Sequence, residues 1–343
     1  MRPLKRKSRA RSLFLIVLSL ILVFVSCGCA GDNQSAGGSS GQTAGVSSGS
    51  GAISDGTVAI YSSFPTLPAL EYPSYMSEGY ACQIREYTEY SQPLEALAAG
   101  EADICVAPLP AVLEAHLGGV PVKILCNFYQ MGSSVVASPS LNISSIEGLS
   151  GKTVGYTEGT MEYALLRVQL YNSGIDSSLI TWKEMDPSQL NDALRSGEID
   201  AYCGDASLAG TAFSQGYGKL LPYPYSSDLG YGNLVLVTTD SAIEEKSDWI
   251  QEIVNANYQV MEMATPLEDY GLSAAESLGL DPEGVALEKD NYQWYWDMEE
   301  EYVMFTRNLC NYFLQLGIFD EMPDMDQLFD FSFLEVRSQE FIK

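Results

Sequence analysis

The stretch that decides the fold is EALAAGEAD, residues 95–103, because it returns as DALRSGEID at residues 192–200. Each copy has the pattern of a helix that ends at a glycine, followed by an acidic turn that leads into an apolar strand. The same offset of 97 residues (192 minus 95) relates Gly119 to Gly216. This repeat predicts two similar halves. The alternative is coincidence, because many helices end at a glycine before a strand.

Both copies predict strands that alternate with helices, which is typical of parallel sheets covered on both faces. In the first half we expect strands at residues 57–61, 104–107 and 122–126 and helices at residues 93–99 and 111–117. In the second half we expect strands at residues 153–156 and 201–203 and helices at residues 161–173, 188–196 and 208–215. An apolar strand at residues 233–238 and helices at residues 249–264, 266–278 and 291–316 follow.

These elements predict an α/β protein of two doubly wound lobes joined by a two-strand hinge. We expect lobe I to comprise residues 55–138 and 234–343 and lobe II residues 139–233. The chain then crosses between the lobes near Ser138 and near Leu234. Two crossings of this kind form a hinge that lets the lobes close around a ligand.

The first 54 residues carry signals of export. Six Lys and Arg precede an apolar run at residues 13–25 that is interrupted only by Ser19, and this run is shorter than the roughly 20 residues of a membrane span. It leads into Val25-Ser26-Cys27, which resembles the cleavage site of bacterial lipoproteins. We expect a signal peptide at residues 1–27, a lipid on Cys27 or alternatively on Cys29, and a flexible Gly/Ser tether at residues 28–54. A plain signal peptide or an uncleaved anchor is the alternative.

Charge and cysteine content exclude several classes of function. Twelve of the 18 Lys and Arg follow Cys27, against 45 Asp and Glu. Nucleic acid is therefore excluded as a partner, because binding a polyanion needs a cationic face. The five cysteines after Cys29 are odd in number and have no CxxC spacing, which favours buried thiols over a disulfide framework or a metal site. We find no nucleophile elbow, phosphate loop or metal-binding motif, and we expect no catalytic residue, cofactor or metal.

Several segments together resemble one family. They are IEGLSGKTVG at residues 146–155, EGT at 158–160, NSGID at 172–176 and ALRSGEIDA at 193–201. The chain resembles, over about residues 57–320, the solute-binding proteins of ABC importers, in the class that takes nitrate, taurine, alkanesulfonates and thiamine-pyrimidine precursors (NitT/TauT-like). The resemblance implies the type II periplasmic-binding-protein fold, a small-molecule solute held between the lobes, and delivery to a permease with its ATPase.

The same resemblance has two departures. Many relatives carry Glu-Pro after the strand that ends this repeat, whereas this chain has Gly204-Asp205-Ala206. Only one histidine, His116, is present, and the run of cysteines of the related fungal pyrimidine synthases is missing. The second departure argues against an enzyme of that kind.

The expected ligand site lies beyond the carboxyl ends of the strands, where loops enter helices. The repeat offset pairs residues 61–64 with residues 158–161, so it predicts facing contacts from both lobes. These are Ser62, Ser63 and Phe64 in lobe I, and Gly159, Thr160 and Met161 in lobe II. Hydroxyls and a close backbone approach suit a polar ligand. The alternative for Ser63 and Thr160 is that they only cap their helices.

Four further residues complete the predicted site. Pro108 and Asp205 follow the next strands, and Gly132 and Tyr231 lie where the chain crosses between lobes. Asp205 is a natural partner for an amino group or a protonated ring nitrogen. Its alternative role is the N-cap of the following helix.

The leading interpretation is a monomeric, extracytoplasmic, lipid-anchored solute-binding protein. Its ligand is expected to be a pyrimidine-like or amine-bearing heterocycle rather than a sulfonate or nitrate, since an anion would need Arg or Lys in the cleft. The alternatives are a lyase or synthase on the same fold, or a surface sensor.

Overall fold

A computed structural model describes residues 54–222, 224–264 and 268–334, which belong to one compact unit, residues 51–343. The expected signal peptide, the tether, Cys27 and Cys29 lie outside the described residues. Within the described part, no helix is both long and apolar enough to cross a membrane.

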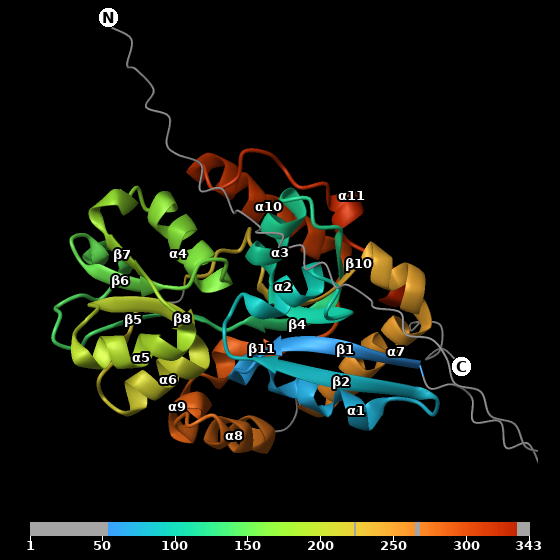
Figure 1. Ribbon diagram of the computed structural model, residues 1–343. Coiled ribbons are helices and arrows are strands. Elements are labelled where there is room, and N and C mark those ends of the chain that lie inside the picture. Colours follow the sequence, from blue (N-terminus) through green and yellow to red (C-terminus); the bar gives the residue numbers. More distant parts are fainter. Residues whose placement is uncertain (1–53, 223, 265–267, 335–343) are drawn as a thin grey trace, which may run out of the picture. The chain divides into compact units, whose positions relative to one another are not determined.

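Two mixed sheets organise the described chain (Figure 1). The sheet of lobe I has the order β11-β4-β10-β3-β1-β2. Its strands are β1 (Ser54–Tyr61), β2 (Tyr80–Tyr87), β3 (Ile104–Pro108), β4 (Val122–Met131), β10 (Gly232–Thr239) and β11 (Tyr292–Trp294). The sheet of lobe II has the order β7-β6-β8-β5-β9. Its strands are β5 (Ser133–Ala137), β6 (Thr153–Tyr156), β7 (Thr181–Glu184), β8 (Ala201–Asp205) and β9 (Lys219–Leu220).

Helices cover both sheets. Those of lobe I are η1 (Phe64–Glu71), α1 (Tyr72–Tyr75), α2 (Gln92–Ala98), α3 (Leu109–Leu117), α7 (Asp240–Ala264), α10 (Glu300–Leu316) and α11 (Met325–Leu328). Those of lobe II are η2 (Ile146–Leu149), α4 (Met161–Asn172), η3 (Ser177–Leu179), α5 (Pro187–Ser196) and α6 (Ala206–Ser214). In lobe II, α4 packs in one apolar cluster with Val135 and Val154, while α5 and α6 pack in another with Val136 and Tyr202. Neighbouring residues of β5 point to opposite faces, so helices cover both sides, as predicted for a doubly wound lobe.

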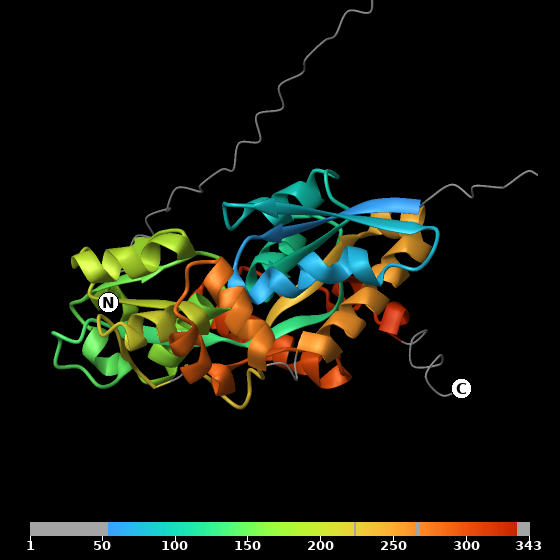
Figure 2. The same cartoon turned by 90° about the horizontal axis from the view of Figure 1, so that it is seen from below.

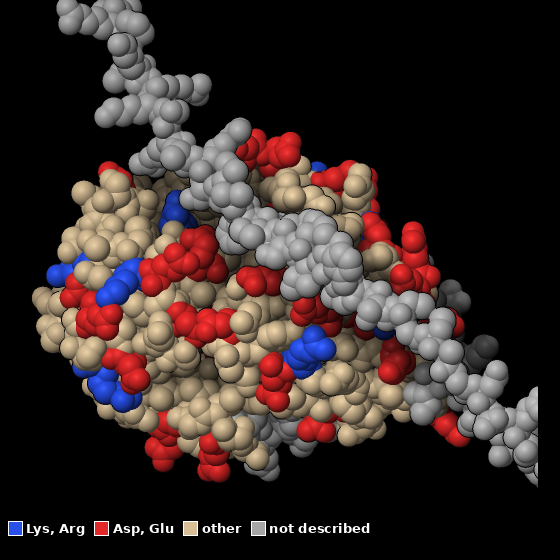
Figure 3. Space-filling view, viewed as in Figure 1, with Lys and Arg blue, Asp and Glu red and all other residues tan. Residues whose placement is uncertain are grey.

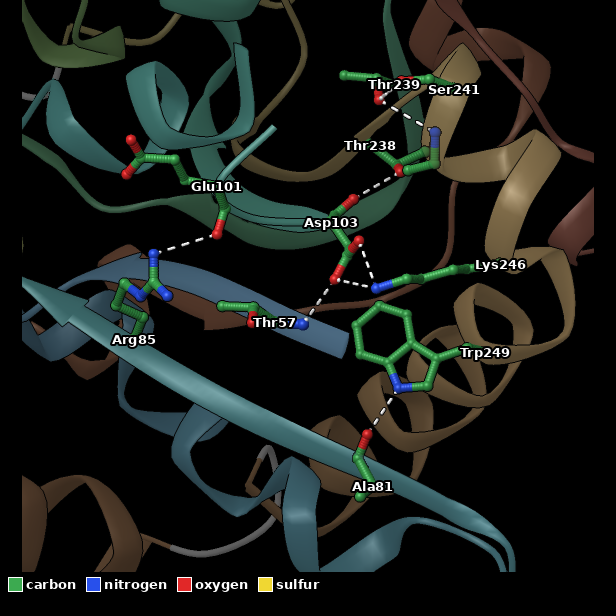
Figure 4. Close-up of polar contacts among 11 residues, drawn as sticks. Thr57, Ala81, Arg85, Glu101, Asp103, Thr238, Thr239, Ser241, Lys246 and Trp249 are labelled. Carbon is green, nitrogen blue, oxygen red and sulfur yellow. Dashed lines mark hydrogen bonds and ion pairs between the residues drawn. The ribbon is translucent and has the colours of Figure 1, made fainter. Parts of the chain in front are cut away.

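The repeated Asp has the same structural role in both lobes. The Asp103 carboxylate accepts a hydrogen bond from Thr57 N at 2.8 Å, and the Asp200 carboxylate accepts one from Thr153 N at 2.9 Å. Each bond joins one strand to the turn that leads into its parallel neighbour, β1 to the turn before β3 in lobe I and β6 to the turn before β8 in lobe II. In lobe I, Lys246 Nζ also contacts Asp103 at 2.9 Å, and Thr238 donates to the Asp103 carbonyl (Figure 4). The predicted similarity of the two halves is therefore confirmed at the level of one side-chain contact.

The first crossing between the lobes lies earlier than predicted. Residues 133–137 form β5, which pairs with β8 in the second sheet, so the chain crosses before Ser133 rather than near Ser138. Met131 and Gly132 both have left-handed backbone conformations, with φ of 61° and 80°. This pair turns the chain out of β4 and into β5. The turn at Gly132 agrees with the expectation that this residue lies where the chain crosses between the lobes, whereas the boundary near Ser138 was placed too late.

The C-terminal part also differs from the prediction. A single helix was expected over residues 291–316, but Tyr292–Trp294 form the edge strand β11 and α10 begins at Glu300. Tyr and Trp favour strands where a partner edge is available, and β4 supplies that edge. Trp294 is buried and its indole N–H donates to Pro65 O at 2.9 Å.

The segment before β11 packs on both lobes. It consists of α8 (Glu268–Ser277), α9 (Pro282–Leu287) and η4 (Lys289–Asn291), drawn in orange in Figures 1 and 2. Helix α8 lies against Phe64 of η1 in lobe I, and α9 lies against α6 of lobe II. Helix α9 lies against α6 with Gly284 facing Gly210, so closely that a Cβ on Gly210 would lie 2.1 Å from Gly284 O. The C-terminal part was predicted to finish on lobe I alone. It bridges both lobes instead.

We predict that Gly210→Ala destabilises the protein by roughly 1–3 kcal/mol, because the new methyl overlaps the α9 backbone. Urea unfolding measures this change. The matched control is Gly271→Ala in α8, where a Cβ would meet ordinary contacts of 3.5 Å or more and helix propensity favours Ala. Equal stability of the two variants would contradict the proposed close contact.

Candidate functional site

A cavity of about 430 Å³ lies between the lobes. Lobe I contributes the β1–η1 junction, the end of β3 and the start of β10. Lobe II contributes the N-terminal ends of α4, α5 and α6. Helix N-termini and strand ends therefore meet at one place, which is where ligands bind in α/β folds.

Six of the ten residues predicted from the sequence line this cavity. They are Ser62, Ser63, Phe64, Pro108, Thr160 and Asp205. All six lie at or after the carboxyl end of a strand, the place where the sequence predicted the ligand site. Ser63 and Thr160, from the two lobes, thus reach the same cavity.

The other four predicted residues lie outside its lining. Met161 is buried in an apolar cluster with residues of α3, and Gly159 holds a left-handed turn with φ of 76° beside Ala111. Gly132 lies against the ring of Tyr129 at the crossing, and Tyr231 is 52 % exposed. Backbone geometry and packing therefore account for the positions of these four residues.

Two of the cavity residues also cap helices. Thr160 Oγ1 accepts from Tyr163 N at 3.2 Å and donates to Thr157 O at 2.8 Å. Asp205 Oδ1 accepts from Ser207 N at 2.8 Å and from Ser207 Oγ at 2.5 Å. The capping role that the sequence left as an alternative is thus present at both positions, and it holds both side chains in place.

Asp205 also receives a hydrogen bond from lobe I. Tyr129 Oη, near the end of β4, donates to Asp205 Oδ2 at 3.0 Å. Burial raises the pKa of Asp205, while the hydrogen bonds from Ser207 and Tyr129 lower it. With donors on both oxygens, Asp205 is well supported as a carboxylate.

Glu162 is a second acid in the cavity, and sequence reasoning missed it. It is the second residue of α4, and its side chain is 6 % exposed. Asn233 Nδ2 donates to Glu162 Oε1 at 2.9 Å. Burial, followed by the negative charge of Asp205, raises the pKa of Glu162 from 4.5 to about 7. An acid in a first helical turn usually serves the helix dipole on the surface, so its sequence position did not indicate a buried site.

A direct contact joins the two lobes across the cavity. Tyr61 Oη, at the end of β1, donates to Asp186 Oδ1 at 3.0 Å. Asp186 is the N-cap of α5 and also accepts from Ser188 N. The ring of Tyr90 packs edge-on against Tyr61 at 5.3 Å between centroids. Tyr61 and Tyr90 are two further lining residues that the sequence did not single out.

The charge around the cavity is negative. Arg195 is the one Lys, Arg or His among the described residues that line it, and it lies in the last turn of α5. Its guanidinium stacks 4.4 Å from the ring centre of Tyr217 and is 3.5 Å from Asp192. Acidic side chains also outnumber basic ones on the face seen in Figure 3. An anion bound beside Asp205 and Glu162 would therefore have few positive groups to neutralise its charge.

The cysteines play no visible part in the site as metal ligands. Among the described residues, no group of three or more His, Cys, Asp or Glu could hold a metal ion. Cys105, Cys126, Cys203 and Cys310 are buried thiols, and Cys82 is half-buried.

The architecture and the cavity define a class: a two-lobed α/β protein of the periplasmic-binding type, with its cavity between the lobes. The model of the family described as "NMT1/THI5 like" matches residues 65–266, more than half of the chain. The chain belongs to this family.

Solved structures share the fold at low sequence identity. The alkanesulfonate-binding protein SsuA of Xanthomonas axonopodis pv. citri, bound to MOPS, is 14 % identical, with a TM-score of 0.71 over 81 % of this chain and 99 % of that one. The periplasmic nitrate-binding protein NrtA of Synechocystis PCC 6803 is 10 % identical, with a TM-score of 0.71 over 84 % of this chain and 89 % of that one. These likenesses confirm the predicted fold class.

One relative is similar in sequence. The "Putative thiamine biosynthesis protein" of Haemophilus influenzae is 26 % identical over 169 residues, which is 48 % of this chain and 53 % of that protein. The chain thus spans about half the length of this curated relative.

We predict that the empty protein loses stability as the pH rises, in part through Glu162. Its folded pKa of about 7 lies above its ordinary value of 4.5, so the folded state holds this proton more tightly than the unfolded chain. The contribution is fully present below pH 4.5 and is lost as the pH passes 7, to a limit of about 3 kcal/mol. Glu162→Gln should flatten this slope in urea unfolding from pH 5 to pH 8.

The control for this experiment is Glu245→Gln, which changes an exposed acid on α7. This variant should keep the slope of the unmodified protein. An identical slope in all three proteins would mean that Glu162 is not buried as described.

Proposed function

We propose that the protein is the solute-binding component of an ABC importer and captures a small organic solute between its lobes. The observation that carries this proposal is the cavity lined from both lobes, with Tyr61 and Asp186 in contact across it. Membership of the family and the likeness of the fold to sulfonate- and nitrate-binding proteins support it. The partners are then a permease and its ATPase.

The ligand in this proposal is an amine-bearing or pyrimidine-like heterocycle. Asp205 and Glu162 offer acceptors to a ligand in the cavity. The one described cation of the lining, Arg195, lies in the last turn of α5 and contacts Asp192. A sulfonate or nitrate needs several donors or a cation in its site. Tyr61, Phe64 and Tyr90 add aromatic surface on which a flat ring can pack.

Binding without chemical conversion is the function the site supports best. The cavity acids are engaged with a helix cap, Tyr129 or Asn233, and the described lining pairs no nucleophile with a histidine base. The name of the Haemophilus influenzae relative suggests an enzyme of thiamine biosynthesis as the alternative. Conversion of a captured heterocycle by the purified protein would favour that alternative.

We predict that Asp205→Asn weakens binding of an amine-bearing heterocycle by roughly 10- to 100-fold, because a hydrogen bond to a charged group contributes about 1.5–3 kcal/mol. The substitution keeps an N-cap residue, so α6 should stay folded. A thermal-shift screen against pyrimidines, amines, sulfonates and nitrate finds the ligand, and calorimetry measures its affinity. Asp248→Asn, which changes an exposed acid of α7 outside the cavity, is the control. Selective stabilisation by sulfonate or nitrate would contradict the proposed ligand class.

We also propose that Cys27 carries a lipid that holds the protein to the outer side of the membrane. We predict that Cys27→Ser moves the protein from the membrane fraction to the soluble fraction, because stable attachment needs the acyl chains. Cys29→Ser is the matched control and should stay in the membrane fraction. The reverse result would transfer the lipid to Cys29, and retention of both variants would indicate an uncleaved apolar anchor.

A further inference from the structure

Glu162 lines the cavity but is almost completely buried from solvent. Its side chain is 6 % exposed, yet it lines the cavity beside Asp205. An ionised carboxylate in such a place is costly unless a cation or several donors compensate for the lost water. The ionisation state of Glu162 therefore depends on the groups that face it.

The groups around Glu162 include acids, tyrosines and a thiol. Asp205 at the start of α6 is the negative neighbour. Tyr90 before α2, Cys203 on β8 and Tyr225 before β10 also interact electrostatically with it. Burial raises the pKa of all three, so they stay neutral near neutral pH. The neutral partners of Glu162 are Asn233 on β10 and its own cap residue Thr160.

The donors in this part of the cavity are unequally divided. Asp205 receives Ser207 N, Ser207 Oγ and Tyr129 Oη, which support its negative charge. Glu162 receives Asn233 Nδ2 from β10. The described cation of the lining, Arg195, lies at the far end of α5 and contacts Asp192. When two acids share a site and one is stabilised as the anion, the other keeps its proton.

We propose that Glu162 recognises the ligand as an un-ionised carboxylic acid, and that the ligand is a neutral heterocycle with a ring-nitrogen acceptor beside an amino-group donor. This inference rests on the proposed function. With its pKa raised to about 7, Glu162 is mainly in the acid form below pH 7.

The chemistry of the two forms of Glu162 distinguishes the ligands. The acid form presents an O–H donor and a C=O acceptor side by side, which matches a ring nitrogen next to an amino group. The ionised form presents acceptors only and matches a cation with two N–H donors, such as an amidinium. A buried acid kept neutral so that it can donate a hydrogen bond is an established device in protein sites.

The test uses cytosine as the neutral probe and benzamidine as the cationic probe in calorimetric titrations from about pH 6 to about pH 9. For cytosine, affinity for the unmodified protein should fall roughly tenfold per pH unit above the Glu162 pKa, because the acid form disappears. Glu162→Gln offers an N–H donor and a C=O acceptor permanently, so it should keep the affinity and lose the pH dependence. Glu245→Gln, which changes an exposed acid of α7 outside the cavity, is the control and should keep the pH dependence of the unmodified protein.

A second measurement does not depend on a variant. Carbon-13 NMR of labelled glutamate carboxyls in the unmodified protein follows the ionisation of Glu162 directly. Its pKa should rise when cytosine binds, because the neutral form is the one that binds.

The opposite results overturn the inference. Affinity for benzamidine that rises with pH, a loss of ten-fold or more in Glu162→Gln, and a Glu162 pKa that falls on binding would show that the ionised acid takes a cation. That outcome leaves the proposed solute-binding function intact. Failure of cytosine, of the wider pyrimidine and amine panel, and of benzamidine to bind would overturn both the inference and the proposed ligand class.

Discussion

A carboxylate that ties two parallel strands together, β1 to β3 in one lobe and β6 to β8 in the other, is the contact on which the arrangement of the strands depends. Asp103 and Asp200 each follow the glycine that ends a helix, and each accepts the backbone N–H of a threonine on the neighbouring parallel strand. Their own backbone N–H groups return a hydrogen bond to the same threonine, at 2.9 and 2.8 Å. The helix end, the turn and the strand register are thereby fixed together, which places the opposite ends of the strands at the cavity.

The repeated strands and helices could be predicted from the sequence because short-range signals mark them. The repeat, the glycine turns and the residues after each strand are short-range signals, and they led to Ser63, Thr160 and Asp205 at one cavity. The paired contacts of Asp103 and Asp200 explain why the repeat is visible at all.

Features that depend on contacts between residues far apart in the chain could not be predicted from the sequence. Strand β11 exists because the edge of β4 lies beside it, although about 160 residues separate the two in the chain. Glu162 looked like an ordinary acid of a first helical turn, and only burial against Asn233 and Asp205 makes it distinctive. The contact of Tyr61 with Asp186 joins two lobes and leaves no local pattern. Residues such as Gly159 and Met161 show the converse, since the right position along the chain did not bring them to the cavity.

The acids of the cavity are tied to the crossing strands. Tyr129 on β4 donates to Asp205, and Asn233 on β10 donates both to Glu162 and to Met131 O. Each lobe II acid is thus held by a residue of the segments that join the lobes. A ligand that draws on Asp205 or Glu162 therefore acts on the same side chains that set the geometry of the crossing.

The contact of α9 with α6 bears on how such a molecule can move. Two crossing strands define a line about which one lobe turns relative to the other, and a third contact away from that line would ordinarily block the turn. Here the two helices meet through Gly210 and Gly284, and Ser214 and Thr211 of α6 hydrogen-bond to Asp281, the N-cap of α9. Helix α9 is therefore fastened to lobe II, so a turn of one lobe relative to the other has to be accommodated between α9 and lobe I.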